Sequence, residues 1–140
     1  MATLKQLRDS AQRKLDGAER LLEGDSPLPS ESAYLASVAM ECALKTLLMI
    51  KNSIRDTQAI EENHQLGPCF RGKHAHNVDR LLSHLKDADL SSISGDLHVR
   101  MTGSGRPYSL RYGEEKLDAG QARDEIKWAG KAVSKIKEFQ

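Results

Sequence analysis

The sequence has few aromatic residues, which limits both its core and its modes of binding. Phe, Trp and Tyr together make up 4% of the 140 residues. The core must therefore be built mainly from Leu, Ile, Val, Ala and Met, a composition that suits helices packed on helices. Few rings are left to stack on nucleic-acid bases, the candidates being Phe70, Tyr108 and Tyr112.

Cysteines and long apolar runs are also scarce. The two cysteines, Cys42 and Cys69, follow no recognisable secretory signal, so we expect reduced thiols in a cytoplasmic protein. No uninterrupted apolar run approaches the ~18 residues that a membrane span needs. The most apolar segment contains Glu41 and Lys45, and we predict no membrane association.

The charges nearly cancel. Lys and Arg number 21 and Asp and Glu number 20, giving a net charge of +1, so the surface as a whole is not a basic surface for nucleic acid. Any attraction to phosphate must come from a local patch. The length suits one domain, which we take as residues 1–140.

Helical periodicity dominates the two ends of the chain. Apolar residues recur every three or four positions between residues 3 and 24, which predicts a first helix. A second helix, capped by Ser30 or Ser32 and running to about Lys51, is apolar nearly all round, which is typical of a central buried helix. A last helix is expected from Asp118, with Gln121 placed to form a capping box.

The middle of the chain has weaker signals. They predict a short helix over 57–63, a loop over 66–73, a third helix from His76 or Asn77, and a fourth helix over 89–101. The Gly-rich segment Thr102–Arg106 follows no strand, so it indicates a turn rather than a phosphate-binding loop. No strand alternation is found, and the predicted fold class is all-α.

Glu41 and Lys45 are the charged exceptions in the second helix. They lie four residues apart with the acid first, the favoured order for a helical ion pair. In a buried helix both charges must be satisfied, with Arg111 as a candidate third member. The pair predicts either a structural polar network or the polar floor of a ligand pocket.

Basic residues gather in two segments of the middle region. The first contains Arg71 and Lys73, and the second contains Arg106 and Arg111. If the two segments meet, Lys73, Arg106 and Arg111 are the candidate phosphate-binding residues. The alternative is an ordinary solvated rim.

Arg71 and His76 form a candidate catalytic pair. Facing one phosphodiester, the Arg would stabilise the transition state while the His moves a proton, and the 2′-hydroxyl of RNA would attack without a metal. Composition alone produces roughly one such pair in a chain of this length, so the spacing by itself favours two solvated loop residues.

Four residues in the same region are of types that bind zinc: His64, Cys69, His74 and His76. Their spacing does not match the close ligand pairs of structural zinc sites. We therefore predict no metal and no cofactor.

In their order, the motifs resemble the HEPN domain family (higher eukaryotes and prokaryotes nucleotide-binding domain). The second helix reads Glu41-Cys-Ala-Leu-Lys45-Thr-Leu-Leu48, similar to the family's Glu-x-x-Leu-Lys-x-Leu-Leu. A His before an apolar helix follows at His76, then an Arg-Tyr element at Arg111, and then the Ala122–Ala129 pattern of the last helix. The resemblance spans nearly the whole chain.

The resemblance implies a four- to five-helix up-and-down bundle that forms a homodimer. Some family members are metal-independent RNases of toxin or antiviral systems that use an Arg and a His. Others bind nucleotides, act as scaffolds or partner a minimal nucleotidyltransferase. Here Gly72 follows Arg71, where nucleases have a polar residue, and the pair falls in a Gly-containing loop.

Three functions follow from these observations. The first is a non-catalytic module that binds nucleotide, RNA or a partner protein in a prokaryotic toxin–antitoxin or defence system. The second is an endoribonuclease that uses Arg71 and His76. The third is a purely structural helical adaptor, which needs no basic patch.

Overall fold

The computed structural model describes residues 2–56, 58–59 and 117–138, and this part is helical. Its elements are α1 (Leu4–Leu21), α2 (Pro29–Lys51) and α7 (Ala119–Glu138). The expectation of an all-α chain is confirmed for these residues, in which the only β pairing is an isolated bridge between Thr3 and Asp56. The helices expected over 57–63, from His76 or Asn77, and over 89–101 lie outside the described residues.

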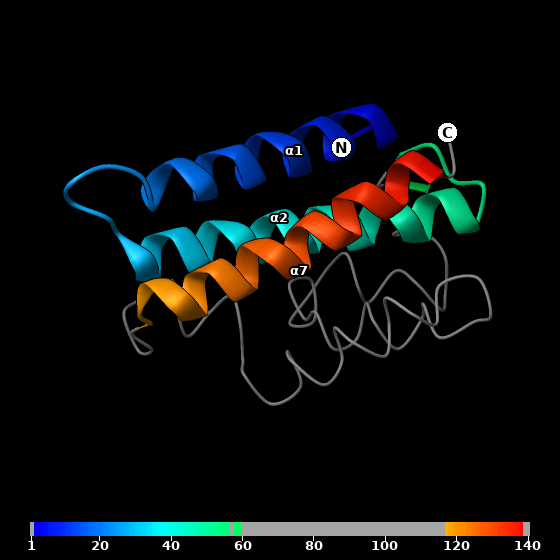
Figure 1. The fold of residues 1–140 in the computed structure, drawn as a ribbon. Helices are drawn as coiled ribbons and strands as arrows, with labels where there is room; N and C mark the ends of the chain where they lie inside the picture. The colour runs from blue at the N-terminus through cyan, green and yellow to red at the C-terminus, as the bar shows by residue number, and fades with distance from the viewer. Residues whose placement is uncertain (1, 57, 60–116, 139–140) are drawn as a thin grey trace.

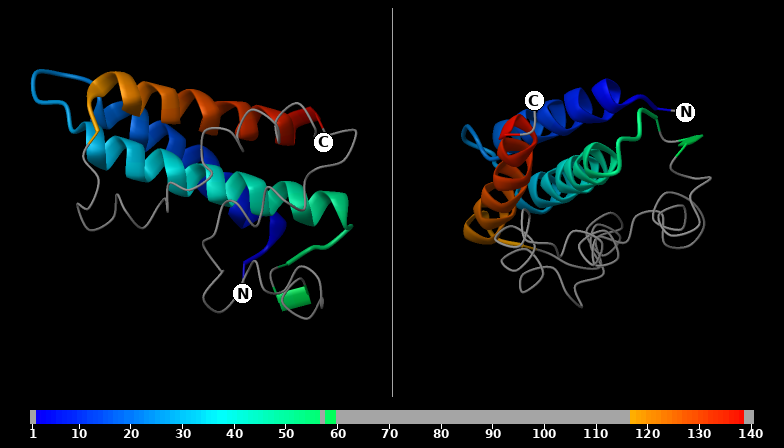
Figure 2. Two further views of the ribbon diagram at one scale, coloured as in Figure 1. Left: turned by 90° about the horizontal axis from the view of Figure 1, so that it is seen from below. Right: turned by 90° about the vertical axis from the view of Figure 1, so that its right-hand side faces the viewer.

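The three helices lie side by side with their axes roughly aligned (Figures 1 and 2). The chain runs along α1, turns back along α2, and follows the direction of α2 again along α7. α2 packs against both α1 and α7, whereas α1 and α7 contact each other only sparsely. α2 is therefore the central element of the described part.

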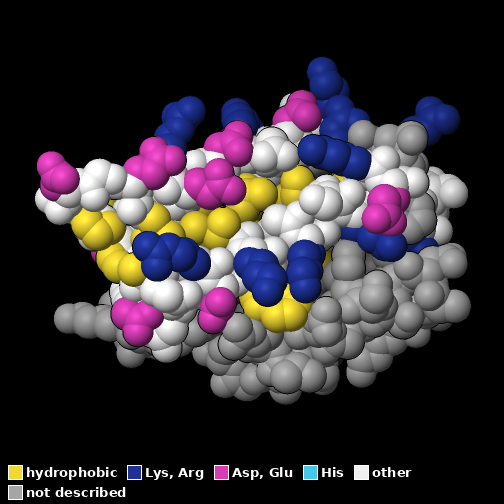
Figure 3. All heavy atoms as spheres, viewed as in Figure 1, with side chains coloured by type: hydrophobic (Ala, Val, Ile, Leu, Met, Phe, Trp, Pro, Cys, Tyr) yellow, Lys and Arg dark blue, Asp and Glu magenta, His cyan; other side chains and the backbone are white. Residues whose placement is uncertain are grey.

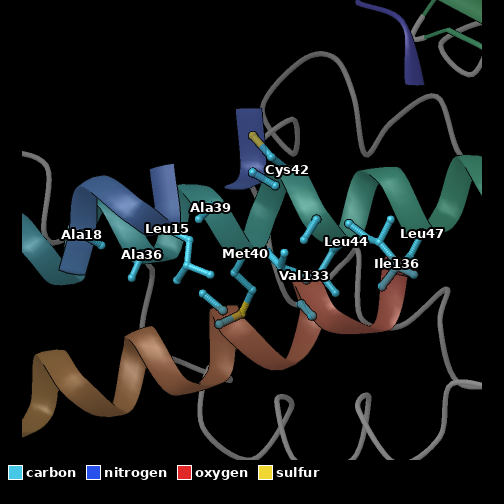
Figure 4. Packing of buried hydrophobic residues seen from close by; sticks show 14 of the residues in the cluster. Leu15, Ala18, Ala36, Ala39, Met40, Cys42, Leu44, Leu47, Val133 and Ile136 are labelled. Atoms are coloured by element: carbon cyan, nitrogen blue, oxygen red, sulfur yellow. The ribbon is translucent and has the colours of Figure 1, made fainter. Parts of the chain in front are cut away.

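Burial of α2 confirms its prediction as a central helix. Every residue from Ala39 to Met49 is buried. In Figure 4, Met40, Leu44 and Leu47 of α2 meet Val133 and Ile136 of α7. Alanines fill the interface of α2 with α1, and Gly17 of α1 lies so close that an added Cβ would be 2.8 Å from Leu35 Cδ2. Small residues therefore let the two axes approach.

α1 begins at the predicted place and ends earlier than predicted. Thr3 is its N-cap, and its side chain and that of Gln6 form a capping box. The helix stops at Leu21 rather than at Gly24, because the next amides donate to carbonyl groups three residues back and tighten the last turn. Gly24 lies in the connecting turn with φ of +84°, which glycine adopts without strain.

The predicted cap of α2 is wrong. Neither Ser30 nor Ser32 caps the helix, which begins at Pro29 after Leu28, with no side-chain cap. Proline at the first helical position has the right φ and lacks an amide that would need a partner. The two serines instead join helices: Ser32 Oγ donates to Ala18 O at 2.6 Å, and Ser30 Oγ accepts from Leu117 N at 3.0 Å.

The start of the last helix is as predicted. Asp118 Oδ1 accepts from Gln121 N at 2.8 Å, and Gln121 Oε1 accepts from Asp118 N at 3.0 Å. These two bonds are the reciprocal capping box expected from the sequence. The amphipathic stripe is also confirmed, with Ala122, Ala129, Val133 and Ile136 buried.

By length and composition alone, α2 is long and apolar enough to cross a membrane. The sequence analysis predicted no segment of that kind. The helix has 23 residues and a mean hydropathy of 1.5 in its most apolar window, but 78% of that window is buried inside the fold. A core helix passes the same test, so the absence of membrane association stays a prediction.

Removing the Ser32 hydroxyl tests the link between α1 and α2. We expect Ser32→Ala to lower the free energy of unfolding by about 1 kcal/mol, because a buried hydrogen bond is lost. Urea denaturation measures the change. Ser26→Ala, at an exposed turn position, is the matched control and should change stability little. Equal stability of the two variants would contradict the role of this bond.

Candidate functional site

A polar row crosses the buried surface of α2. Ser37, Glu41 and Lys45 follow one another at four-residue spacing, so they lie along one side of the helix. All three are buried, at 0%, 6% and 8% exposure. Leu35 and Cys42, which contact α1, lie on a different side of α2. The row therefore points away from α1.

The predicted ion pair is present. Lys45 Nζ lies 3.6 Å from Glu41 Oε2, and the two side chains are 10% and 7% exposed. The distance allows attraction but is long for a strong charge-assisted hydrogen bond. Water is largely excluded from the pair, so each charge depends on its protein surroundings. Arg111, the candidate third member, lies outside the described residues.

Sequence reasoning missed two further buried polar residues, Ser37 and Glu125. Ser37 is fully buried, and its Oγ makes no hydrogen bond within the described part of the chain. Glu125 of α7 is 5% exposed. Its position carried a signal, because it lies three residues after Ala122 and four before Ala129, on the apolar stripe. A third buried charge, on α7, is thus built into the fold.

Cys42 lies at the contact between α1 and α2 and is buried. Burial raises the pKa of its thiol above the ordinary value of 9.0, and the charge of Glu41 raises it further. Lys14 and a hydrogen bond from Ser10 act in the opposite direction but do not reverse the shift. Because the thiolate is the nucleophile, the structure indicates an inert thiol held in the core.

The structure does not place the remaining predicted site residues. Arg71, His76, Lys73 and Arg106 all lie outside the described residues, as do His64, Cys69 and His74. Within residues 2–56, 58–59 and 117–138, no group of His, Cys, Asp and Glu side chains could hold a metal ion. The candidate site that the structure describes is therefore the buried polar row of α2.

This arrangement can orient a polar group but provides no obvious reaction centre of its own. Buried carboxylates and an ammonium in a water-poor region interact strongly with any charge placed near them. Within the described residues, the groups suit a structural network or one wall of a polar pocket, the two interpretations that the sequence left open.

A double-mutant cycle tests the coupling of Glu41 and Lys45. We expect Lys45→Met to lower the free energy of unfolding by about 3 kcal/mol, because it removes the ammonium group that lies 3.6 Å from a buried carboxylate. Glu41→Gln together with Lys45→Met should cost less than the sum of the single changes. Thermal and urea denaturation of the four proteins give the coupling. Additive effects would show that the two charges are stabilised independently.

The buried thiol gives a second prediction. In a Cys69→Ser background, we expect Cys42 to react with a disulfide reagent at pH 8 roughly a hundredfold more slowly in the folded than in the denatured chain. The folded state holds the thiol proton more tightly, so this group's contribution to stability is lost as pH rises through 9.0 and above. Similar rates in both states would show that Cys42 is accessible.

No family model, curated protein or solved structure matches this chain in the comparisons with known proteins. The likeness to HEPN domains therefore depends on the residues and motifs quoted from the sequence.

Proposed function

We propose that this chain is a HEPN-like helical module that binds a nucleotide, RNA or a partner protein without cleaving it, in a prokaryotic toxin–antitoxin or defence system. The observation that carries the proposal is the buried pair of Glu41 and Lys45 in the central helix. These are the two charged residues of the motif that resembles the family's, and their burial gives that motif a physical role.

The described helices are aligned as in a helical bundle: α1 runs opposite to α2, and α7 runs in the same direction as α2 (Figure 1).

Binding would be electrostatic and local. The net charge of +1 gives no general attraction to phosphate, so the basic segments containing Lys73, Arg106 and Arg111 would have to supply it. Partners of this kind of module include a minimal nucleotidyltransferase or another defence protein. The proposal includes a cytoplasmic, homodimeric protein with no cofactor.

The second candidate function is a metal-independent endoribonuclease. In it Arg71 would orient the scissile phosphate, and His76 would take the proton from the 2′-hydroxyl and return one to the leaving oxygen. The observation that favours it is the pairing of these two residues inside a basic segment. Gly72 and the loop-like sequence around the pair favour the non-catalytic function instead.

The third candidate is a structural adaptor that needs no basic surface. Charge reversal at Arg106 and Arg111 separates it from the binding module. Partner binding that survives both reversals favours the adaptor, whereas loss of binding favours an electrostatic contact.

Cleavage and binding assays on one RNA test the proposal. We expect the native chain to bind a mixed structured RNA or a nucleoside triphosphate and to leave the RNA intact in EDTA. Arg106→Ala with Arg111→Ala should weaken binding about tenfold, and more salt should weaken native binding too. Arg13→Ala with Arg20→Ala removes two exposed charges from α1 and is the matched control.

Metal-independent cleavage by the native chain would contradict this proposal. If Arg71→Ala with His76→Ala then abolished cleavage, the endoribonuclease assignment would replace it. No binding of nucleotide or RNA, with partner binding unaffected by charge reversal at Arg106 and Arg111, would assign the adaptor.

A further inference from the structure

A strip of apolar side chains is visible between α1 and α7 (Figure 3). It arises because α2 contacts both helices along their length while α1 and α7 contact each other sparsely. On α7, Ile126, Gly130 and Val133 lie three or four residues apart and share one side. A Cβ added at Gly130 would meet no atom within 4 Å. The surface is therefore open at that residue.

The two borders of this strip carry opposite charges. Along α1, acidic side chains gather on one border, and along α7, basic side chains gather on the other (Figure 3). The C-terminal half of α1 and the residues just after it contribute Asp16, Glu19 and Glu23, all exposed. The N-terminal half of α7 contributes Arg123 and Lys127, also exposed.

The four outermost groups of these borders form no ion pair in the part of the chain that the structure describes. Among the described residues, no ion pair joins α1 to α7, and Glu19, Glu23, Arg123 and Lys127 take part in no ion pair. The bases are four residues apart on α7, about 6 Å along the helix, and the acids are four residues apart in sequence, with Glu19 on α1 and Glu23 in the turn that follows it. The two rows therefore have matching spacing in sequence.

We propose that the strip between α1 and α7, bordered by Glu19 and Glu23 on one side and Arg123 and Lys127 on the other, is a contact surface for a second copy of this chain. A two-fold axis parallel to the helices would place α1 of each copy over α7 of the other. Because α1 and α7 run in opposite directions (Figure 1), the acidic end of α1 then meets the basic end of α7.

In this arrangement Glu19 faces Lys127 of the second copy, and Glu23 faces Arg123. The two-fold symmetry repeats the same two ion pairs. Each copy therefore contributes the same surface to the contact, as an isologous interface requires. A partner of a single charge sign would match one border and repel the other. The near-zero net charge of +1 adds little general repulsion between copies. The inference rests on the homodimer of the proposed function and names the surface that joins its two copies, so a dimer that is insensitive to the charge reversals would overturn the surface and leave the dimer itself in place.

Charge reversal in two separate chains tests the surface. Analytical ultracentrifugation from about 1 to about 200 µM should show a native dimer. Glu19→Lys with Glu23→Lys should weaken dimerisation roughly a hundredfold, because four attractive pairs become repulsive. Arg123→Glu with Lys127→Glu should do the same. Arg13→Glu with Arg20→Glu makes an equal change in charge on exposed positions of α1 and should leave dimerisation unchanged.

Mixing the two reversed chains completes the test. One chain then has basic residues on both borders and the other has acidic residues on both, so neither should pair with itself but together they should form a one-to-one dimer. Circular dichroism checks that each variant is folded. A native monomer over the whole range, a dimer that is insensitive to the reversals, or a mixture that stays monomeric would each overturn the proposal.

Discussion

The described fold depends on one constraint: α2 is apolar over nearly its whole circumference and must be covered on every side. Eleven consecutive residues, from Ala39 to Met49, are buried, so no side of the helix in that segment is available to water. α1 and α7 cover it with alanines and branched side chains, and small residues such as Gly17 allow α1 to approach closely. A central helix of this kind needs neighbouring helices with one apolar side and one polar side, and α1 and α7 are both of that type.

Covering α2 also buries its charges, and this links the core to the candidate site. Glu41 and Lys45 lose most of their water, and a buried pair of this kind adds little net stability compared with a well-packed apolar pair. Their presence in the core is thus poorly explained by stability alone. Ser37, four residues before Glu41, extends the polar row, and Glu125 is a further buried carboxylate on the adjacent helix. A polar region maintained against the cost of desolvation is the type of feature that sets a specific structure or binds a polar group.

The parts of the fold that follow from local periodicity could be predicted from the sequence. The buried central helix, the amphipathic last helix and the capping box of Asp118 and Gln121 each depend on residues within one or two turns. The start of α2 could not be predicted in the same way: Ser30 and Ser32 are good capping residues, but their partners are Leu117 and Ala18, far away in the sequence. For the same reason periodicity found the Glu41–Lys45 pair within one helix. The burial of Glu125, on another helix, was signalled only by its position on the apolar stripe of α7.

α7 separates two regions of different chemistry. Glu125 and Ile126 are adjacent in sequence, and a helix turns 100° between successive residues. Their side chains therefore lie on two different sides of α7. Glu125 is buried, whereas Ile126 and Gly130 belong to the side next to the strip between α1 and α7. A substitution at Arg123 or Lys127 therefore changes the strip's border without touching a buried charge. Charge reversal at Arg123 and Lys127 can consequently test the proposed contact surface while the buried charges stay unchanged, because the strip's border and the buried polar residues share no side chain.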